Sequence, residues 1–146
     1  AVLILYLLAI GSPTHPITPR SWLAWRRERI TYAGYTFMSD GPLFIHQYSH
    51  AWVDFRHRRE NWYPYTNYFA NSVAATRAHR QFCIDLAAEF PAYGPDVWGV
   101  SASDSERGYV AWGGPPRHPD IDGTVVPAAA GGSLMFTPDI TLPSRA

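Results

Sequence analysis

The hydrophobic and polar positions of this chain alternate between helix-like segments and long loops. Residues 1–10, AVLILYLLAI, are almost wholly apolar and predict the end of a buried helix that Gly11 terminates. The longest periodic segment is residues 66–90, where apolar residues recur at helical spacing until Pro91. Residues 123–135 are again small or apolar, and they predict a further helix.

Three shorter segments carry local signals. Ser21 is expected to cap a helix over residues 22–29. Residues 30–38 mix β-branched and aromatic residues with glycine, which is typical of either a short strand or an extended loop. The sequence Ser39-Asp40-Gly41-Pro42 is typical of a helix start, so we expect a helix from Gly41 to about Arg58.

A long aromatic loop follows the longest predicted helix. Residues 92–121 are rich in Gly, Pro, Ser and Asp, and a loop of this length is commonly functional. Its aromatic residues, Trp98, Tyr109 and Trp112, argue against disorder. Thr137 then predicts the start of one more helix. Helices joined by long aromatic loops predict an all-α toroid whose loops build a site at one end.

Composition narrows the function classes. The 146 residues suffice for one domain, and 12 basic against 12 acidic residues give no electrostatic footprint for nucleic acid. The apolar run at residues 1–10 is too short to span a membrane. The single cysteine, Cys83, is expected to be a buried thiol. The chain does not begin with Met and both ends look cut, so we expect a segment of a longer protein.

The aromatic content of 15% is high, and aromatic side chains present flat apolar faces that suit sugar rings as well as a core. The first polar cluster lies on the predicted helix from Gly41, where His46, His50 and Asp54 recur every four residues. Such a set can bind zinc, but Gln47 stands where the metalloprotease motif needs glutamate. A structural network and the wall of a ligand cleft remain as alternatives, and Tyr48 and Arg56 favour the cleft.

Acidic residues in the loops supply candidates for catalysis. Asp104 lies among small hydroxylated residues and glycines, and it could act as a general acid or base or merely cap a turn. The alternate aspartates Asp120 and Asp122 resemble half of a calcium loop, and Asp122 equally resembles a helix cap. Together with Asp40 and Asp54, these carboxylates lie amid aromatics and hydroxyls, which is the composition of a carbohydrate site.

Five stretches of the chain, in the same order, resemble a known family. They are GSPTHPI (11–17), GPLFIHQYSHAWVDFR (41–56), NYFANSVAATRAHRQFCID (67–85), YGPDVWGVSASDSERGYVAWGGPP (93–116) and DGTVVPAAAGGSLMFTP (122–138). Together they are similar to the glycoamylase-like domain of bacterial glycoside hydrolases. That group includes endo-β-1,2-glucanases and, more distantly, the transglycosylating domain of cyclic β-1,2-glucan synthases.

The resemblance implies an (α/α)6 toroid, of which residues 1–146 would form one incomplete domain segment. It also implies hydrolysis of a β-linked glucan without a cofactor, in a periplasmic or secreted protein. The synthase-type domain has a glutamate in its WGxSES-like motif, whereas this chain has Ala102 in WGVSAS. That difference favours the hydrolase-type branch and leaves the identity of the proton donor open.

The resemblance and the polar clusters described above together suggest a role for each candidate residue. Asp104 and Asp54 are the catalytic candidates. The residues expected to bind the glucan are His46, Gln47, Tyr48, His50, Arg56, Trp98, Ser103, Tyr109, Trp112 and Asp122, with no metal ligand among them. The alternatives are a non-catalytic carbohydrate-binding or structural fragment, and the transglycosylating domain of a synthase.

Overall fold

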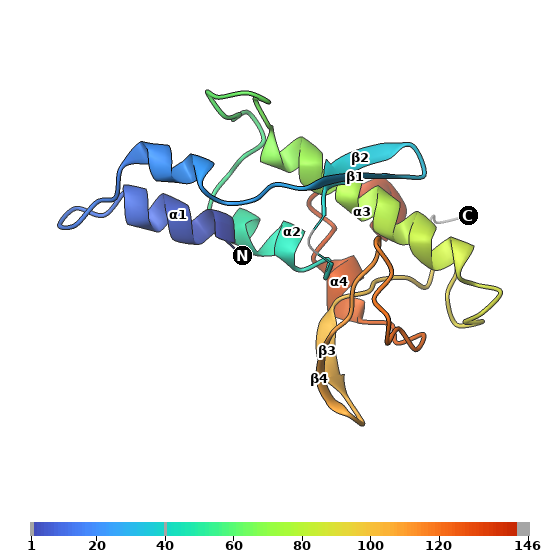
Figure 1. Ribbon diagram of the computed structural model, residues 1–146. Coiled ribbons are helices and arrows are strands. Elements are labelled where there is room, and N and C mark those ends of the chain that lie inside the picture. The colour runs from blue at the N-terminus through green and yellow to red at the C-terminus, as the bar shows by residue number, and fades with distance from the viewer. Residues whose placement is uncertain (1, 40, 143–146) are drawn as a thin grey trace.

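The computed structural model describes residues 2–39 and 41–142, and in these residues the fold is mixed rather than all-α (Figure 1). The helices are α1 (Val2–Ile10), α2 (Ile45–Tyr48), α3 (Tyr68–Asp85), α4 (Pro127–Gly131) and α5 (Pro138–Thr141), with 3-10 turns η1 (Pro19–Leu23) and η2 (Ser49–Ala51). The strands are β1 (Arg29–Tyr32), β2 (Tyr35–Met38), β3 (Ala102–Ser105) and β4 (Gly108–Ala111).

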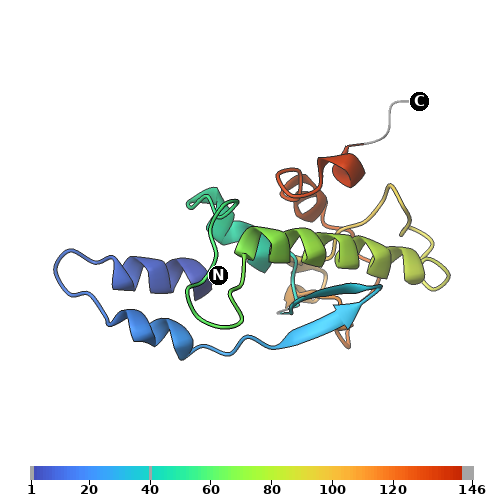
Figure 2. The ribbon, with the colours of Figure 1, turned by 90° about the horizontal axis from the view of Figure 1, so that it is seen from above.

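Helix α3 is the longest element, and it confirms the helix predicted over residues 66–90 with closer bounds. The side chain of Asn67 caps its start by accepting a hydrogen bond of 2.9 Å from the backbone N–H of Ala70. In Figure 2 the helix crosses the middle of the molecule beside the β1–β2 hairpin, and Phe37 of β2 is buried with Ala75 and Ala78 of α3. The small alanines let the hairpin approach the helix closely.

Residues 30–38, for which the sequence allows either a strand or an extended loop, belong to the antiparallel hairpin β1–β2. Its two strands pair from Arg29 opposite Met38 to Tyr32 opposite Tyr35. The turn residues Ala33 and Gly34 have φ of 49° and 82°, the left-handed conformation that a two-residue hairpin turn requires.

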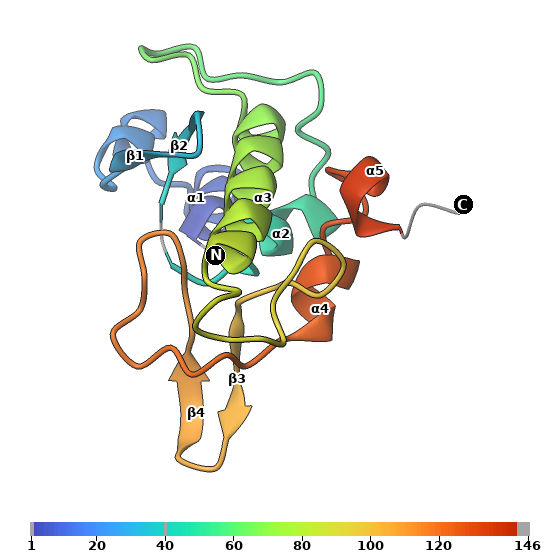
Figure 3. The same cartoon turned by 90° about the vertical axis from the view of Figure 1, so that its right-hand side faces the viewer.

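The second hairpin, β3–β4, lies inside residues 92–121, where the sequence predicted a loop without strands. It projects from one end of the molecule (Figures 1 and 3). The largest core cluster lies where the hairpin joins the rest of the molecule. It includes Trp98, Val100 and Trp112 together with Phe82 and Cys83 of α3. Burial raises the pKa of the Cys83 thiol to about 11, as expected for a structural cysteine.

The N-terminal helix α1 confirms the predicted helix, but not its burial, because only Leu3 of its described side chains is buried. The helix predicted over residues 22–29 is wrong. The chain there forms η1, which begins at Pro19, and then runs extended into β1. Leu3 and Trp22 join α1 to η1 in a second core cluster, while Leu5 and Leu8 of α1 are each 64% exposed. Within the described residues, no helix is long and apolar enough to cross a membrane.

Two further predicted helices are shorter than expected. In place of the helix expected from Gly41 to Arg58, the chain forms only α2 and, directly after it, η2, which ends at Ala51. The helix expected over residues 123–135 is only α4, which begins at Pro127. The final helix predicted after Thr137 is confirmed as α5.

Candidate functional site

The segment α2–η2 is fixed between two parts of the chain that lie far from it in sequence. The backbone N–H of Leu43 donates to the carbonyl of Val100 at 3.2 Å, and that of Phe44 donates to Ser101 Oγ at 3.2 Å. On the other side, the Ser72 hydroxyl of α3 donates to the carbonyl of His46 at 2.9 Å. These contacts hold the histidines of α2 and η2 against α3.

His46 and His50 are placed together, as the four-residue spacing predicted. His46 is buried against the rings of Phe37 and His79. The Nε2 atom of His50 lies 3.1 Å from Ser72 Oγ. Burial lowers the pKa of each histidine to about 4, and the nearby carboxylate of Asp54 only partly opposes the shift for His50. Both imidazoles are therefore neutral at neutral pH, and the His50 ring forms a hydrogen bond with the Ser72 hydroxyl.

Asp54 does not share a helix face with these histidines, because the helix ends at Ala51; that part of the prediction is wrong. Its carboxylate accepts hydrogen bonds from Arg56 Nε at 2.9 Å and Arg56 Nη2 at 2.7 Å. Arg56 thereby holds the pKa of the Asp54 carboxyl well below its ordinary value, so the group stays ionised. An ionised carboxylate can act as a base or stabilise positive charge.

The zinc alternative finds no support in this arrangement. The carboxylate of Asp54 is bound by Arg56, and it does not face a shared centre with His46 and His50. In the part of the chain that the structure describes, no three His, Cys, Asp or Glu residues are grouped so as to hold a metal ion.

Asp54 and Arg56 lie in an open groove of about 420 Å³ whose other lining residues are His50, Ala51, Trp52, Val53, Phe69 and Met135. Trp52 in this lining has a 70% exposed side chain, so its ring is available as a platform beside the ion pair. An aromatic face next to a carboxylate and a guanidinium is a suitable combination for a sugar.

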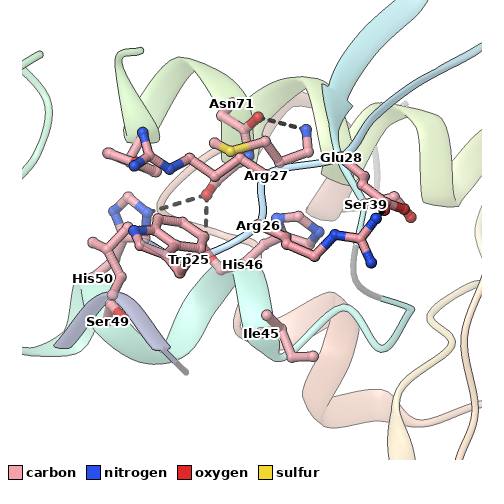
Figure 4. Close-up of a pocket in the computed structure, with 14 residues that line it drawn as sticks. Trp25, Arg26, Arg27, Glu28, Ser39, Ile45, His46, Ser49, His50 and Asn71 are labelled. Atoms are coloured by element: carbon pink, nitrogen blue, oxygen red, sulfur yellow. Dashed lines mark hydrogen bonds and ion pairs between the residues drawn. The ribbon is translucent and has the colours of Figure 1, made fainter. Parts of the chain in front are cut away.

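A second pocket, of about 270 Å³, also has His50 in its lining (Figure 4). His46, Ser49 and His50 line it from α2 and η2, Asn71 lines it from α3, and Trp25 lines it from the segment before β1. His50 thus contributes to both hollows.

The two residues between the histidines have different environments. Gln47 Nε2 donates to the carbonyl of Ala129 at 2.7 Å and to Ser133 Oγ at 2.8 Å, which ties α2 to α4. Its amide is thus committed to contacts within the chain. Tyr48 is 49% exposed and remains available at the surface.

The predicted catalytic residue Asp104 lies on β3, exposed and directly opposite Tyr109 of β4. Tyr109 is 68% exposed, and both belong to the hairpin that projects away from the segment following η2 (Figures 1 and 3). The groove that contains Asp54 does not include Asp104. The described residues therefore do not bring the two predicted catalytic carboxylates into one pocket.

The remaining predicted residues have mainly structural contacts. Trp98 and Trp112 are only 3% and 2% exposed, so the structure places them in the core rather than on a sugar-binding surface. The indole N–H of Trp112 donates to Ser103 Oγ at 3.2 Å. Asp122 accepts a hydrogen bond of 2.9 Å from the backbone N–H of Thr124, which makes it a turn residue rather than a helix cap. Asp40 lies outside the described residues.

Known proteins match this chain over almost its whole length. The model of the Glycoamylase family, described as "Putative glucoamylase", matches residues 1–145. The endo-β-1,2-glucanase of Chitinophaga pinensis, solved as a complex with sophorotriose and glucose, shares 30% identity and a TM-score of 0.80 over 95% of this chain. The β-1,2-glucanase of Parabacteroides distasonis shares 28% identity and a TM-score of 0.79, again over 95% of this chain.

Among curated proteins, an exo β-1,2-glucooligosaccharide sophorohydrolase (non-reducing end) of Parabacteroides distasonis is 29% identical over 167 residues, covering 96% of this chain. The chain spans 22% of that relative, 35% of the Chitinophaga pinensis chain and 23% of the Parabacteroides distasonis glucanase. It corresponds to part of each relative. With the family model matched over residues 1–145, this chain belongs to the Glycoamylase family.

Proposed function

We propose that this chain is part of a glycoside hydrolase that cleaves β-linked glucan, with β-1,2-glucan as the substrate. The proposal is supported by the named activities of the relatives, which are β-1,2-glucan hydrolases. We propose further that its helices form one segment of an (α/α)6 toroid, in which other helices complete the substrate cleft.

The groove beside Asp54 is the observation that carries this function. Glycoside hydrolysis uses one carboxyl group that donates a proton and a second that stays ionised. Asp54 suits the second role, because Arg56 binds both of its oxygens and lowers its pKa. In this role Asp54 activates water or stabilises the positive charge that develops at the anomeric carbon, while Trp52 supports a sugar ring.

We assign the proton-donating role to Asp104, which is exposed on β3. Its neighbour across the hairpin, Tyr109, presents an exposed ring and hydroxyl for the substrate. The pair can act only where both carboxyl groups flank one glycosidic bond, so the assignment requires Asp104 and Asp54 to lie closer together in the complete domain than in the described residues, where they occupy the hairpin and the groove.

Isosteric substitution of the two carboxylates tests this function. Asp54→Asn and Asp104→Asn should each lower the rate of β-1,2-glucan hydrolysis by about a hundredfold or more, because each removes a carboxyl group that takes part in the reaction. Asp96→Asn, at an exposed position outside both hollows, serves as the matched control. Near-normal hydrolysis by either variant would refute the role assigned to that residue.

A second candidate function is glucan binding without catalysis. It is favoured by the separation of Asp54 from Asp104 and by the share of at most 35% that the chain spans of these relatives. Retention of the protein on β-1,2-glucan with no release of reducing ends would support binding alone. Longer or cyclic products from oligosaccharides would instead indicate glycosyl transfer.

A further inference from the structure

Helix α1 (Val2–Ile10) is apolar on all its sides. Its nine residues, VLILYLLAI, include no charged side chain, and the hydroxyl of Tyr6 is their only polar side-chain group. A helix that meets water on one side ordinarily carries polar residues there, whereas a helix that is apolar all round is ordinarily buried on every side. The composition of α1 therefore predicts packing contacts around its whole circumference.

The described residues cover only one side of α1. Leu3, Leu7 and Ile10 belong to the second core cluster or pack against it. With 3.6 residues in each turn, these three share one side of the helix, and Leu5 and Leu8 lie on the opposite side. Figures 1 and 2 show α1 at one end of the molecule, with η1 alongside. Leu5 and Leu8, each 64% exposed, form the outer face of α1.

The chemistry of the outer face restricts what can cover it. Leu5 and Leu8 are three residues apart, so their side chains are neighbours and form a short apolar ridge. Contact of this ridge with water is unfavourable. A charged or hydroxylated surface would not suit it, because the leucines offer no group to pair with a buried polar atom. A ridge of this kind fits the groove between side chains of a second, apolar helix face.

The small size of the outer face argues against a second copy of the chain as its permanent partner. Stable interfaces between separate proteins bury at least about 1,200 Å². One side of a nine-residue helix supplies only a small part of that area, so a second copy covers it only transiently. A helix of the same polypeptide needs less area, because it does not lose the freedom of an independent molecule when it docks.

The relatives described above have ample chain for such a helix, since most of the length of each lies outside the part that this chain matches. We infer that the outer face of α1 packs against an uncharged, apolar face of a helix from the part of the protein outside residues 1–146. Helix α1 is then internal in the complete domain. The inference rests on the proposed toroid, and it adds where a further helix docks and what surface that helix presents.

Hydroxyl-radical footprinting of the complete wild-type protein, which contains residues 1–146 and the rest of its polypeptide, tests the inference. The oxidation rate of a leucine side chain follows its exposure to solvent. Leu5 and Leu8 should be oxidised about tenfold or more slowly in the native protein than in the same protein unfolded by heat. Native rates close to those of the unfolded protein, as 64% exposure would give, would overturn the inference.

Cysteine labelling provides a second measurement on the complete protein. Leu5→Cys and Leu8→Cys should each react with a maleimide about a hundredfold more slowly than Glu106→Cys, at the exposed turn between β3 and β4. Cys83 is buried and gives the same slow background in all three variants. Equal rates for Leu5→Cys and Glu106→Cys would overturn the inference.

Two further outcomes would identify a different partner and would also overturn the inference. Protection of Leu5→Cys that disappears on dilution would mean that a second copy covers the outer face. Protection that arises only after lipid vesicles are added would mean that a membrane surface does. All labelling is done without glucan, so protected leucines in a protein that cleaves no glucan would refute the proposed function alone.

Discussion

At the scale of single residues, burial and pairing set the charge of the groups around the site. His46 and His50 are neutral because they are buried, whereas Asp54 is held ionised by Arg56. A neutral imidazole can donate one hydrogen bond and accept another, which suits contact with hydroxyl groups. The ionised carboxylate and the exposed ring of Trp52 then supply the charge and the flat surface that a sugar requires.

The lowered pKa of His46 predicts a loss of stability in acid. Its pKa is about 4 in the folded protein and near 6.5 in the unfolded chain, so the unfolded chain takes up the proton first as the pH falls. The stabilisation is complete above pH 6.5 and is lost between pH 6.5 and 4, by about 3 kcal/mol for this residue. Urea unfolding measured at pH 7 and at pH 4.5 checks the size of the effect.

Replacement of the titrating group makes that measurement specific. His46→Gln should reduce the pH dependence of the unfolding free energy and leave the part due to His50 and His79, whose pKa values burial also lowers. His15→Gln, at an exposed position, should leave it unchanged. An unaltered pH dependence in His46→Gln would show that burial does not hold this imidazole neutral.

Only part of this residue-scale picture could be predicted from sequence. The four-residue spacing of His46 and His50 sufficed to place them together, because the short helix spans both. The position of Asp54 could not be predicted, because it depends on the helix ending at Ala51 and on the local pairing with Arg56.

At the scale of elements, α3 is the support for the site. Its buried face carries Ser72, which fixes both α2 and His50, and Ala75 and Ala78, which accommodate β2. Residues 66–90 have the length and the apolar stripe that make a helix predictable from sequence, although the helix ends at Asp85 and not at Pro91 as predicted. The strands were less predictable, because four-residue hairpins depend on turn conformation and on packing beneath them.

Removal of the cap of α3 should destabilise the protein. Asn67→Ala removes the side-chain acceptor for the N–H of Ala70, so we expect the unfolding free energy to fall by about 1 kcal/mol. Asn61→Ala changes an exposed asparagine in the preceding connection, and it should alter stability by less than about 0.5 kcal/mol. Equal effects of the two substitutions in denaturant unfolding would show that the cap contributes nothing.

At the scale of the whole molecule, the chain combines a core under the β3–β4 hairpin with a second core between α1, η1 and α3. The family and its order of motifs were predictable, because long stretches such as residues 41–56 and 93–116 keep a specific pattern. The all-α description was not correct, because aromatic and glycine-rich segments can form either loops or short hairpins until tertiary packing decides.

The exposed face of α1 predicts self-association of the 146-residue chain. Leu5 and Leu8 are each 64% exposed on an apolar helix, and adjacent exposed apolar side chains promote association in water. Leu5→Gln with Leu8→Gln should therefore reduce the weight-average mass in sedimentation experiments. Leu142→Gln, at an exposed leucine outside α1, should not. An equal effect of Leu142→Gln, or none from the pair in α1, would rule this face out as the cause.

The central proposal is that the protein to which this chain belongs hydrolyses β-1,2-glucan through Asp54 and Asp104. The most direct measurement is chromatographic analysis of the products after incubation with linear β-1,2-glucan, with β-1,3- and β-1,4-glucans in parallel. We predict short β-1,2-linked oligosaccharides from the first substrate alone, and their near-complete loss in Asp54→Asn and Asp104→Asn. An intact β-1,2-glucan, or equal cleavage of all three glucans, would contradict the claim.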